Sequence, residues 1–246
     1  MSVLVLRLAG PMQSWGLQSR HQLRDTAGEP TKSGVMGLVA AALGRSRQAS
    51  VSDLMGLAMT VRIDRGGTLQ RDFQTAGGGQ LAGISRYGVA TAGGGSPRTS
   101  LSTRYYLADA DFRVALDGDA ALLKEIAGCL NSPRWPLFLG RKSFVPSAPL
   151  LRQLYDDRTG VEVLSILEPW YSRRKNPLAG SDEAMKLKLV VERRDGDAPS
   201  GGLVEVRQDV IDRFDTRDFR RREVEVRWME VDPKLIEEDP TCIFLH

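Results

Sequence analysis

MSVLVLRLAG (residues 1–10) and SGVMGLVAAALG (residues 33–44) are the stretches that decide the fold. The first is rich in Val and Leu, which predicts a strand over Ser2–Leu8 that ends at Gly10-Pro11. The second predicts a helix that Ser33 caps and Gly44 stops. Because this helix is apolar almost all round, we expect it to pack closely against a sheet.

The segments that follow extend this start into a mixed pattern. A short helix is expected after Ser52, and a helix over 121–130 is expected to be capped within 117–119. Further strands are expected over Thr60–Asp64, over Thr103–Leu107 and Phe112–Leu116 on either side of a turn at 108–111, and within 136–150. The resulting βαββαβ order predicts an α+β, ferredoxin-like domain.

The distribution of glycines and the later strand patterns predict two additions to this domain, an inserted hairpin and a C-terminal subdomain. Ten of the 25 glycines lie between residues 66 and 95, which predicts a long flexible hairpin inserted at about 70–105. After residue 150, alternating segments over Met185–Arg193, Leu203–Val210 and Arg222–Val231 predict antiparallel strands. We therefore expect a first domain over residues 1–150 and a small, β-rich C-terminal subdomain over residues 151–246.

Composition argues against several classes of function. The 246 residues have a net charge of +3, and two distant cysteines are too few for a disulfide scaffold or a cysteine-rich zinc site. The two histidines, His21 and His246, leave few candidates for acid–base catalysis. No phosphate-loop motif is present, and we expect neither a cofactor nor a metal. Without a signal peptide or a long apolar run, we expect a cytoplasmic protein without a membrane span.

Two basic segments interleaved with aromatic residues favour nucleic-acid binding. Residues 134–152 contain four cations and no acid, and residues 70–106 contain four arginines against Asp72. Tyr105, Tyr106, Trp135 and Phe144 lie among these charges. Cations hold phosphates and aromatic rings stack on unpaired bases. By contrast, the run of arginines at 220–222 is interpreted as a solvated face.

Five stretches resemble one protein family. LRLAGPMQSWG (6–16), PTKSGVMGLVAAALG (30–44), RDFQTAGGG (71–79), TSLSTRYYLADADFRVAL (99–116) and LFLGRKSF (137–144) resemble the Cas-five family of CRISPR-associated proteins, above all its subtype I-E member in the Cascade complex. The resemblance implies a ferredoxin-like, RNA-recognition-motif-like fold with a protruding hairpin, the thumb. It implies a structural subunit that caps the 5′ handle of the CRISPR RNA, without catalysis. The implied partners are the Cas-seven backbone subunit, the Cascade large subunit and, within the complex, target DNA.

The resemblance also assigns candidate RNA-binding positions to four places. These are the loop after the first strand, the start of the first helix, the thumb with its base, and a glycine loop. At Gln74 histidine would be common in the subtype, which puts base-specific contacts there in doubt. Trp15 fits a core anchor equally well, and Ser33 fits a simple helix cap. The candidates are Gln13, Ser14, Trp15, Lys32, Ser33, Arg71, Gln74, Arg86, Arg104, Gly140, Arg141, Lys142 and Ser143.

Two alternative functions remain open from the sequence. The first is a metal-independent endoribonuclease that processes precursor CRISPR RNA, which the related subtype I-C member is; His21 or Tyr and Lys groups would activate a 2′-hydroxyl. The second is a protein-assembly module whose basic patches meet acidic partners. Cleavage of a repeat RNA without metal distinguishes the first alternative from RNA capping, and assembly without RNA distinguishes the second.

Overall fold

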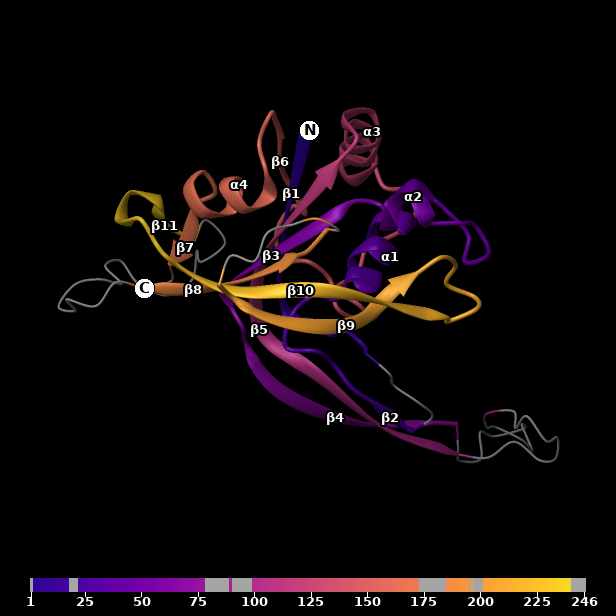
Figure 1. Ribbon diagram of the computed structural model, residues 1–246. Coiled ribbons are helices and arrows are strands. Elements are labelled where there is room, and N and C mark those ends of the chain that lie inside the picture. Colours follow the sequence, from indigo (N-terminus) through magenta and orange to yellow (C-terminus); the bar gives the residue numbers. More distant parts are fainter. Residues whose placement is uncertain are drawn as a thin grey trace.

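The computed structural model describes residues 2–17, 22–77, 89, 99–172, 185–194, 196 and 201–239 (Figure 1). A nine-stranded sheet runs in the order β6-β1-β5-β3-β8-β10-β9, with β2 and β4 also pairing with β5, and β7 pairs with β11 in a second sheet. The elements are β1 (Ser2–Gln13), β2 (Leu23–Arg24), α1 (Lys32–Leu43), α2 (Ser52–Met55), β3 (Ala58–Arg65), β4 (Thr68–Ala76), β5 (Ser100–Gly118), α3 (Ala120–Asn131), β6 (Leu151–Asp156), α4 (Gly160–Ile166), β7 (Trp170–Ser172), β8 (Lys186–Glu192), β9 (Leu203–Ile211), β10 (Phe219–Glu230), a 3-10 turn (Pro233–Leu235) and β11 (Ile236–Glu238).

Strand β1 lies inside the sheet and separates two cores by the alternation of its side chains. Leu4, Leu6 and Leu8 join the larger core under α1 and α3. Val3 and Val5 point to the other face, where α4 covers them. Because successive side chains of a strand point to opposite faces, one apolar strand serves both layers.

The predicted end of β1 at Gly10-Pro11 is wrong, because the strand continues to Gln13. Met12 and Gln13 still pair with β5. On the other side, pairing with β6 stops at Leu6. Pro11 therefore lies where β1 has lost one neighbour, a position at which proline is tolerated because no ladder hydrogen bond is required of it.

The predicted pair of strands around a turn at 108–111 is also wrong, because both belong to the single strand β5. Its C-terminal half pairs with β1 and β3, and its N-terminal half pairs with β4 as far as Ala108. Asp109 has a φ of 62°, which bends the chain between the halves. The paired β4 and β5 consequently leave the core together and project below it in Figure 1.

The two main helices have caps that the sequence largely identifies. Helix α1 ends at Gly44, whose φ of 72° confirms the predicted stop, but its cap is Thr31 and not Ser33. The Thr31 hydroxyl accepts from the Gly34 amide at 3.3 Å. Asp119 caps α3 as predicted, accepting from the Leu122 amide at 2.9 Å. The helix predicted after Ser52 is reduced to the single turn α2.

The strands after residue 150 extend the same sheet. β8 pairs with β3, β10 pairs with β8, and β9 pairs with β10, all antiparallel. The predicted strands near 185–193, 203–210 and 222–231 are thus confirmed. No strand lies within 136–150; β6 instead pairs with β1. Hydrogen bonding therefore continues across the expected boundary at residue 150, and the division into two domains stays a prediction.

A row of buried arginines crosses the face covered by α4. Arg7, Arg113 and Arg62 are paired neighbours on β1, β5 and β3. Arg7 Nη2 lies 2.7 Å from Asp111 Oδ2, and Arg113 Nη1 lies 2.8 Å from Asp111 Oδ1. Because burial of an unpaired charge is costly, these carboxylate partners are what allows the row to lie inside the protein.

Candidate nucleic-acid interface

A groove of about 850 Å³ opens beside the start of α1. Four segments contribute most of its lining: the chain after β1, the start of α1, the loop around residue 140, and the turn between β9 and β10 with the adjoining strand ends. Arg24 of β2 and Arg47 beyond α1 complete it. Three of the predicted positions line this groove. The lining residues are Ser14, Gly16, Leu17, Arg24, Thr31, Ser33, Gly34, Arg47, Gly140, Gln208, Ile211, Phe214, Arg217, Asp218 and Phe219.

Gln13 and Trp15 support the groove from inside and do not face it. Gln13 is fully buried, and its side-chain amide donates to the carbonyls of Leu8 and Ala110, both at 2.8 Å. Trp15 is 1% exposed, and its indole nitrogen donates to Gln13 Oε1 at 3.2 Å. The expectation that the polar groups of Gln13 face RNA is therefore wrong, because the protein interior uses them, and Trp15 is a core anchor.

The glycine loop is held against the segment that follows β1. Ser14 donates its backbone amide to Leu139 O at 3.0 Å. Gly140 has a φ of 93°, and a Cβ there would lie 1.8 Å from Ser14 O. Only glycine permits this approach. Lys142 and Ser143 follow on the exposed part of the same loop, outside the residues that line the groove.

Arg141 lies between this loop and β5. Its Nη2 donates to Tyr105 O at 2.8 Å and to Arg24 O at 3.4 Å. The guanidinium also lies 5.4 Å from the centre of the Phe144 ring. Burial, followed by the charges of Arg104 and Arg24, lowers the pKa of Arg141. Its positive charge is therefore close to the cations Arg104 and Arg24 and to the acids Asp72 and Asp25, and no ion pair within the described residues neutralises it.

Lys32, by contrast, is directed inward. It is 2% exposed, and its Nζ lies 2.5 Å from Glu192 Oε1 on β8. Its backbone amide donates to Asp209 Oδ2 at 2.7 Å. Burial lowers the pKa of Lys32, while Glu192 opposes that change. The expected contact of the Lys32 side chain with RNA is wrong, since its charge is satisfied within the protein; Ser33 lines the groove instead.

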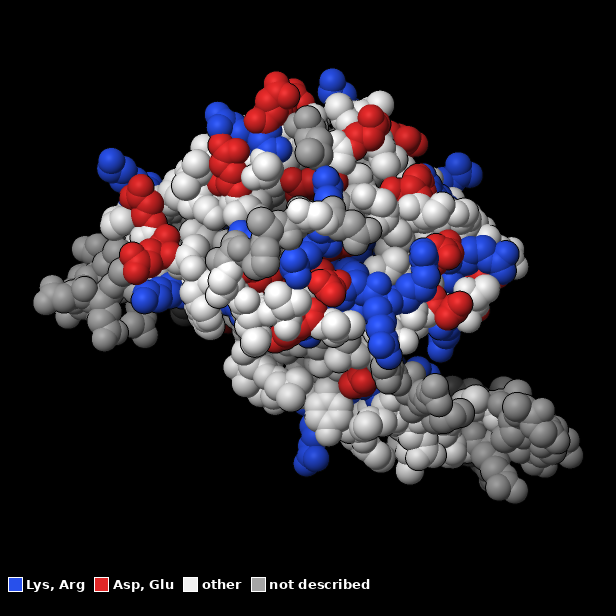
Figure 2. All heavy atoms as spheres, in the orientation of Figure 1, with Lys and Arg blue, Asp and Glu red and all other residues white. Residues whose placement is uncertain are grey.

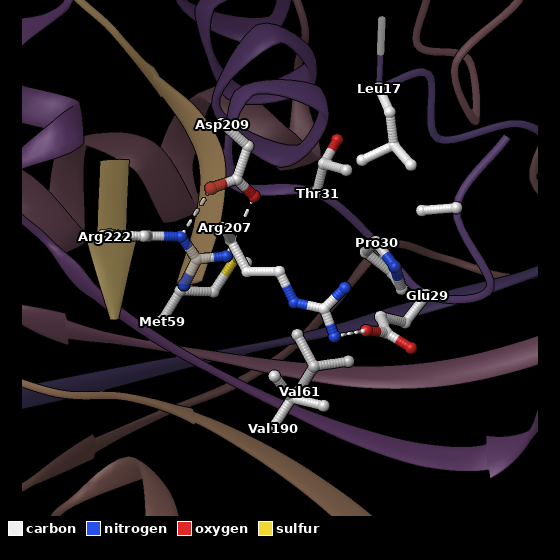
Figure 3. A pocket seen from close by; sticks show the side chains of 11 residues that line it. Leu17, Glu29, Pro30, Thr31, Met59, Val61, Val190, Arg207, Asp209 and Arg222 are labelled. Atoms are coloured by element: carbon white, nitrogen blue, oxygen red, sulfur yellow. Dashed lines mark hydrogen bonds and ion pairs between the residues drawn. The ribbon is translucent and has the colours of Figure 1, made fainter. Parts of the chain in front are cut away.

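Asp209 belongs to a cluster of ion pairs behind the start of α1 (Figure 3). Arg222 reaches Asp209 Oδ1 at 2.6 Å, and Arg207 reaches Glu29 Oε1 at 2.7 Å. These groups line a second cavity of about 20 Å³, which is of the size of one water molecule. Arg222 was expected on a solvated face; it is buried because β9 and β10 bring it to Asp209.

The predicted thumb positions divide between two faces of the β4–β5 pair. Arg104 lies opposite Asp72 in the register, and the Gln74 amide donates to Asp72. Arg71 alternates onto the opposite face, paired with Tyr105. Among the described members of this group, Arg104 is the one whose charge lowers the pKa of Arg141. Arg86 lies outside the described residues, as does His21.

The sequence reasoning missed several residues of the groove. Arg24, Arg47 and Arg217 line it against the single acid Asp218. On the face drawn in Figure 2, Lys and Arg gather over β9, β10 and their turn, with acidic side chains between them. The signal available beforehand was weak, because these residues come from segments far apart in the sequence and only the fold assembles them.

The described part of the chain offers neither a metal-binding cluster nor a membrane-spanning helix. Among its residues, no group of three or more His, Cys, Asp or Glu is arranged to hold a metal ion. None of its helices combines the length and the apolar character needed to cross a membrane.

Comparisons with known proteins agree with one another. The Escherichia coli (strain K12) protein "CRISPR system Cascade subunit CasD" is 34% identical over 166 residues, covering 61% of this chain and 69% of that protein. A chain of a "CRISPR RNA-guided surveillance complex" superposes with a TM-score of 0.78 at 34% identity, covering 97% of this chain and 94% of the other. A "Crystal structure of Cas protein" superposes with a TM-score of 0.67 at 36% identity, over 97% and 99%.

The family comparison covers nearly the whole fold. The match runs over residues 3–231, from the start of β1 to just beyond the end of β10. It therefore includes all four segments that meet at the groove. This chain belongs to the family described as CRISPR-associated protein (Cas_Cas5).

Proposed function

We propose that this chain is a subunit of a CRISPR Cascade surveillance complex that binds and caps the 5′ handle of the CRISPR RNA. The observation that carries the proposal is the groove, where Ser14, Ser33 and Gly140 meet beside arginines. Single-stranded RNA needs cations for its phosphates and close backbone approach. Similarity to a Cascade subunit and to a chain of an RNA-guided complex supports the same function.

The cations that line the groove, and Arg141 next to its lining residue Gly140, suit a ligand that brings its own negative charge. Arg47 donates to a carbonyl, that of Phe214, at 3.1 Å, and Arg141 donates to the carbonyls of Tyr105 and Arg24. A carbonyl supports a guanidinium without cancelling its charge. The positive potential therefore remains available to phosphates, which is the electrostatic requirement of nucleic-acid binding.

The architectural part of the proposal is a ferredoxin-like, RNA-recognition core with a thumb. Along the chain, β1, α1, β3, β5, α3 and β6 follow the βαββαβ order, and their strands are neighbours in the sheet as β6-β1-β5-β3. The projecting β4–β5 pair would be the base of the thumb and would fold over the guide. The proposed protein partners are the Cas-seven backbone subunit and the Cascade large subunit, with target DNA bound by the assembled complex.

We propose further that the RNA is bound without being cut. The test is incubation of the full chain, with EDTA, with a labelled precursor RNA that contains the CRISPR repeat. Native and denaturing gels then report binding and cutting separately. A shifted but intact RNA is the expected result. A discrete cut upstream of the handle would contradict this function and support the endoribonuclease alternative, with His21 as the first residue to replace.

Arg141→Ala tests the glycine loop within this function. We expect weaker handle binding and a salt-dependence slope that is smaller by about 0.7, the value for one phosphate contact on a single strand. Arg158→Ala is the matched control, because Arg158 is an exposed cation beside α4 that pairs with Glu162. Equal affinity and equal slope for the wild type and Arg141→Ala would remove this loop from the site.

A further inference from the structure

The turn between β9 and β10, residues 212–218, forms one wall of the groove, which the glycine loop also lines. It is fixed to the end of α1 and the segment after it. Arg47 Nη2 donates to Phe214 O at 3.1 Å, and the Asp215 amide donates to Arg47 O at 3.2 Å. The Phe214 ring packs so closely on α1 that a Cβ at Gly37 would lie 3.5 Å from it. These contacts hold the turn in place at the side of the groove.

Among the described residues, the charges of this turn are paired except for Arg217 and Asp218, which both line the groove. Arg213 pairs with Asp215, and Arg220 at the start of β10 pairs with Asp212. Arg217 lines the groove and has no ion pair within the described part of the chain. It also has a φ of 55°, a conformation that an arginine adopts at an energetic cost. An exposed cation held in this conformation at a groove is an observation that points to a ligand.

Aromatic surface lies beside that cation. Phe219, two residues beyond Arg217, lines the groove and is half-buried: its side chain packs in part against the larger core and is accessible in part. An aromatic ring next to a cation is the combination that binds an unstacked nucleotide, because the ring stacks on the base and the cation holds the phosphate. A groove of about 850 Å³ falls within the range of roughly 300–1,000 Å³ that is usual for small-molecule sites.

We propose that the β9–β10 turn is a second RNA-contacting wall, at which Phe219 stacks on one unpaired base of the bound strand and Arg217 holds the adjacent phosphate. This inference rests on the proposed function and adds a role for the C-terminal strands. An extended acidic peptide would also satisfy Arg217, but it would leave the Phe219 ring without a stacking partner.

The charge part of the inference is tested with Arg217→Asn. Asparagine tolerates a positive φ, so the substitution removes the cation and keeps the turn. Arg213→Asn is the matched control, with the same change of charge in the same turn but away from the groove. With a labelled single-stranded repeat RNA, we expect Arg217→Asn to weaken binding roughly tenfold and lower the salt slope by about 0.7. Arg213→Asn is expected to leave both unchanged.

The stacking part is tested by combining Phe219→Leu with abasic substitutions along the RNA. Against the wild type, an abasic site at one position is expected to weaken binding by about 5- to 150-fold. Against Phe219→Leu, the same abasic site is expected to have no further effect, because the ring that it stacked on is gone. Thermal melting checks that Phe219→Leu is folded; Arg217→Asn tests the wall independently if it is not.

The outcomes separate this inference from the function on which it rests. If RNA binding depends on Arg141 but the RNA affinities of Arg217→Asn and Arg213→Asn are equal, the proposed role of the β9–β10 turn is wrong and the proposed function stands. No RNA binding by the wild type overturns both. Competition by an acidic peptide, with no effect of any abasic site, also overturns the nucleotide assignment.

Discussion

Two sets of arginines, one on the sheet beneath α4 and the other in loops near the groove, have different partners. Beneath α4, Arg7, Arg62 and Arg113 are paired with carboxylates, and Arg7 and Arg113 also lie 4.5 and 4.8 Å from the centre of the Tyr171 ring. In the groove lining and beside it, Arg47 and Arg141 respectively donate to carbonyls. The first set is neutralised within the fold, and under the proposed function the second set keeps its charge for RNA phosphates.

The difference teaches that the partner of an arginine, more than its exposure, indicates its role. Arg141 is half-buried but bonded to carbonyls, so burial does not make it structural. Arg222 stands in a run of three arginines but is held by Asp209, so a basic run does not make it an RNA contact. We therefore expect substitutions under α4 to affect stability and substitutions at the groove to affect binding.

The largest effect is expected from Asp111→Ala. This substitution leaves Arg7 and Arg113 buried without their shared carboxylate. We expect the free energy of unfolding to fall by about 3–5 kcal/mol, the range for a broken buried ion pair. Urea denaturation measures it, and Asp53→Ala, which breaks the exposed pair with Arg45, is expected to cost about 0–1 kcal/mol. Equal losses in the two variants would remove the distinction between buried and exposed pairs.

Asp209→Asn tests the ion pairs behind the groove, with an expected loss of about 1.5–3 kcal/mol at neutral pH. Burial opposes ionisation of Asp209, but hydrogen bonds and charge from Arg222 hold its pKa below the ordinary value. The folded state thus binds this proton less readily than the unfolded state. The stabilisation is complete above the ordinary Asp pKa of about 3.9 and decreases as pH falls toward the lower folded pKa. Urea titrations at several pH values should show a smaller acid-dependent loss in Asp209→Asn than in the wild type.

Gly140→Ala tests whether the groove depends on backbone geometry as well as on charge. The new Cβ would meet Ser14 O in a conformation that disfavours side chains, so we expect about 1–3 kcal/mol of destabilisation together with weaker RNA binding. Gly128→Ala in α3 is the control, because a Cβ there meets nothing within 4 Å and alanine favours a helix by about 0.5–1 kcal/mol. Unchanged RNA affinity in a folded Gly140→Ala protein would argue against a role for the loop.

The smallest effect on stability is expected from Arg24→Gln. Arg24 lines the groove and has no ion pair among the described residues, so the free energy of unfolding should change by less than about 0.5 kcal/mol. RNA affinity should nevertheless fall, with a salt slope smaller by about 0.7. Lys124→Gln on the exposed side of α3 provides the same charge change away from the groove. A strong loss of stability without loss of RNA binding would contradict the expectation that arginines at the groove serve binding and not stability.

Local signals in the sequence were sufficient for part of the fold. The stop of α1 at Gly44 and the cap of α3 at Asp119 depend on neighbouring residues, and both were predictable. Two predicted interruptions of strands were wrong, because pairing with distant strands overrides the local tendency of the sequence to turn. Pro11 lies within β1 where β6 no longer pairs, and the expected turn at 108–111 is a bend within β5.

The candidate site was predictable to a smaller extent. Ser14, Ser33 and Gly140, three of the candidates, line one groove, and their contact with RNA stays a prediction. Lys32 could not be excluded beforehand, because its partner Glu192 is 160 residues away in the sequence. Arg217 was missed for the same reason: its position at the groove depends on how β9 and β10 pack beside α1.

The central position of β1 has a consequence for synthesis of the chain. β1 lies between β5 and β6, and Ser2 pairs with Gly118, so β1 is synthesised before either of its neighbours in the sheet. Roughly 100 residues of synthesis at about 5–20 residues per second take roughly 5–20 s. During that interval the apolar stretch SVLVLRLAG is an unpaired edge on the nascent chain. Slower translation between β1 and β5 should therefore increase aggregation, and chaperone capture of the first ten residues should reduce it.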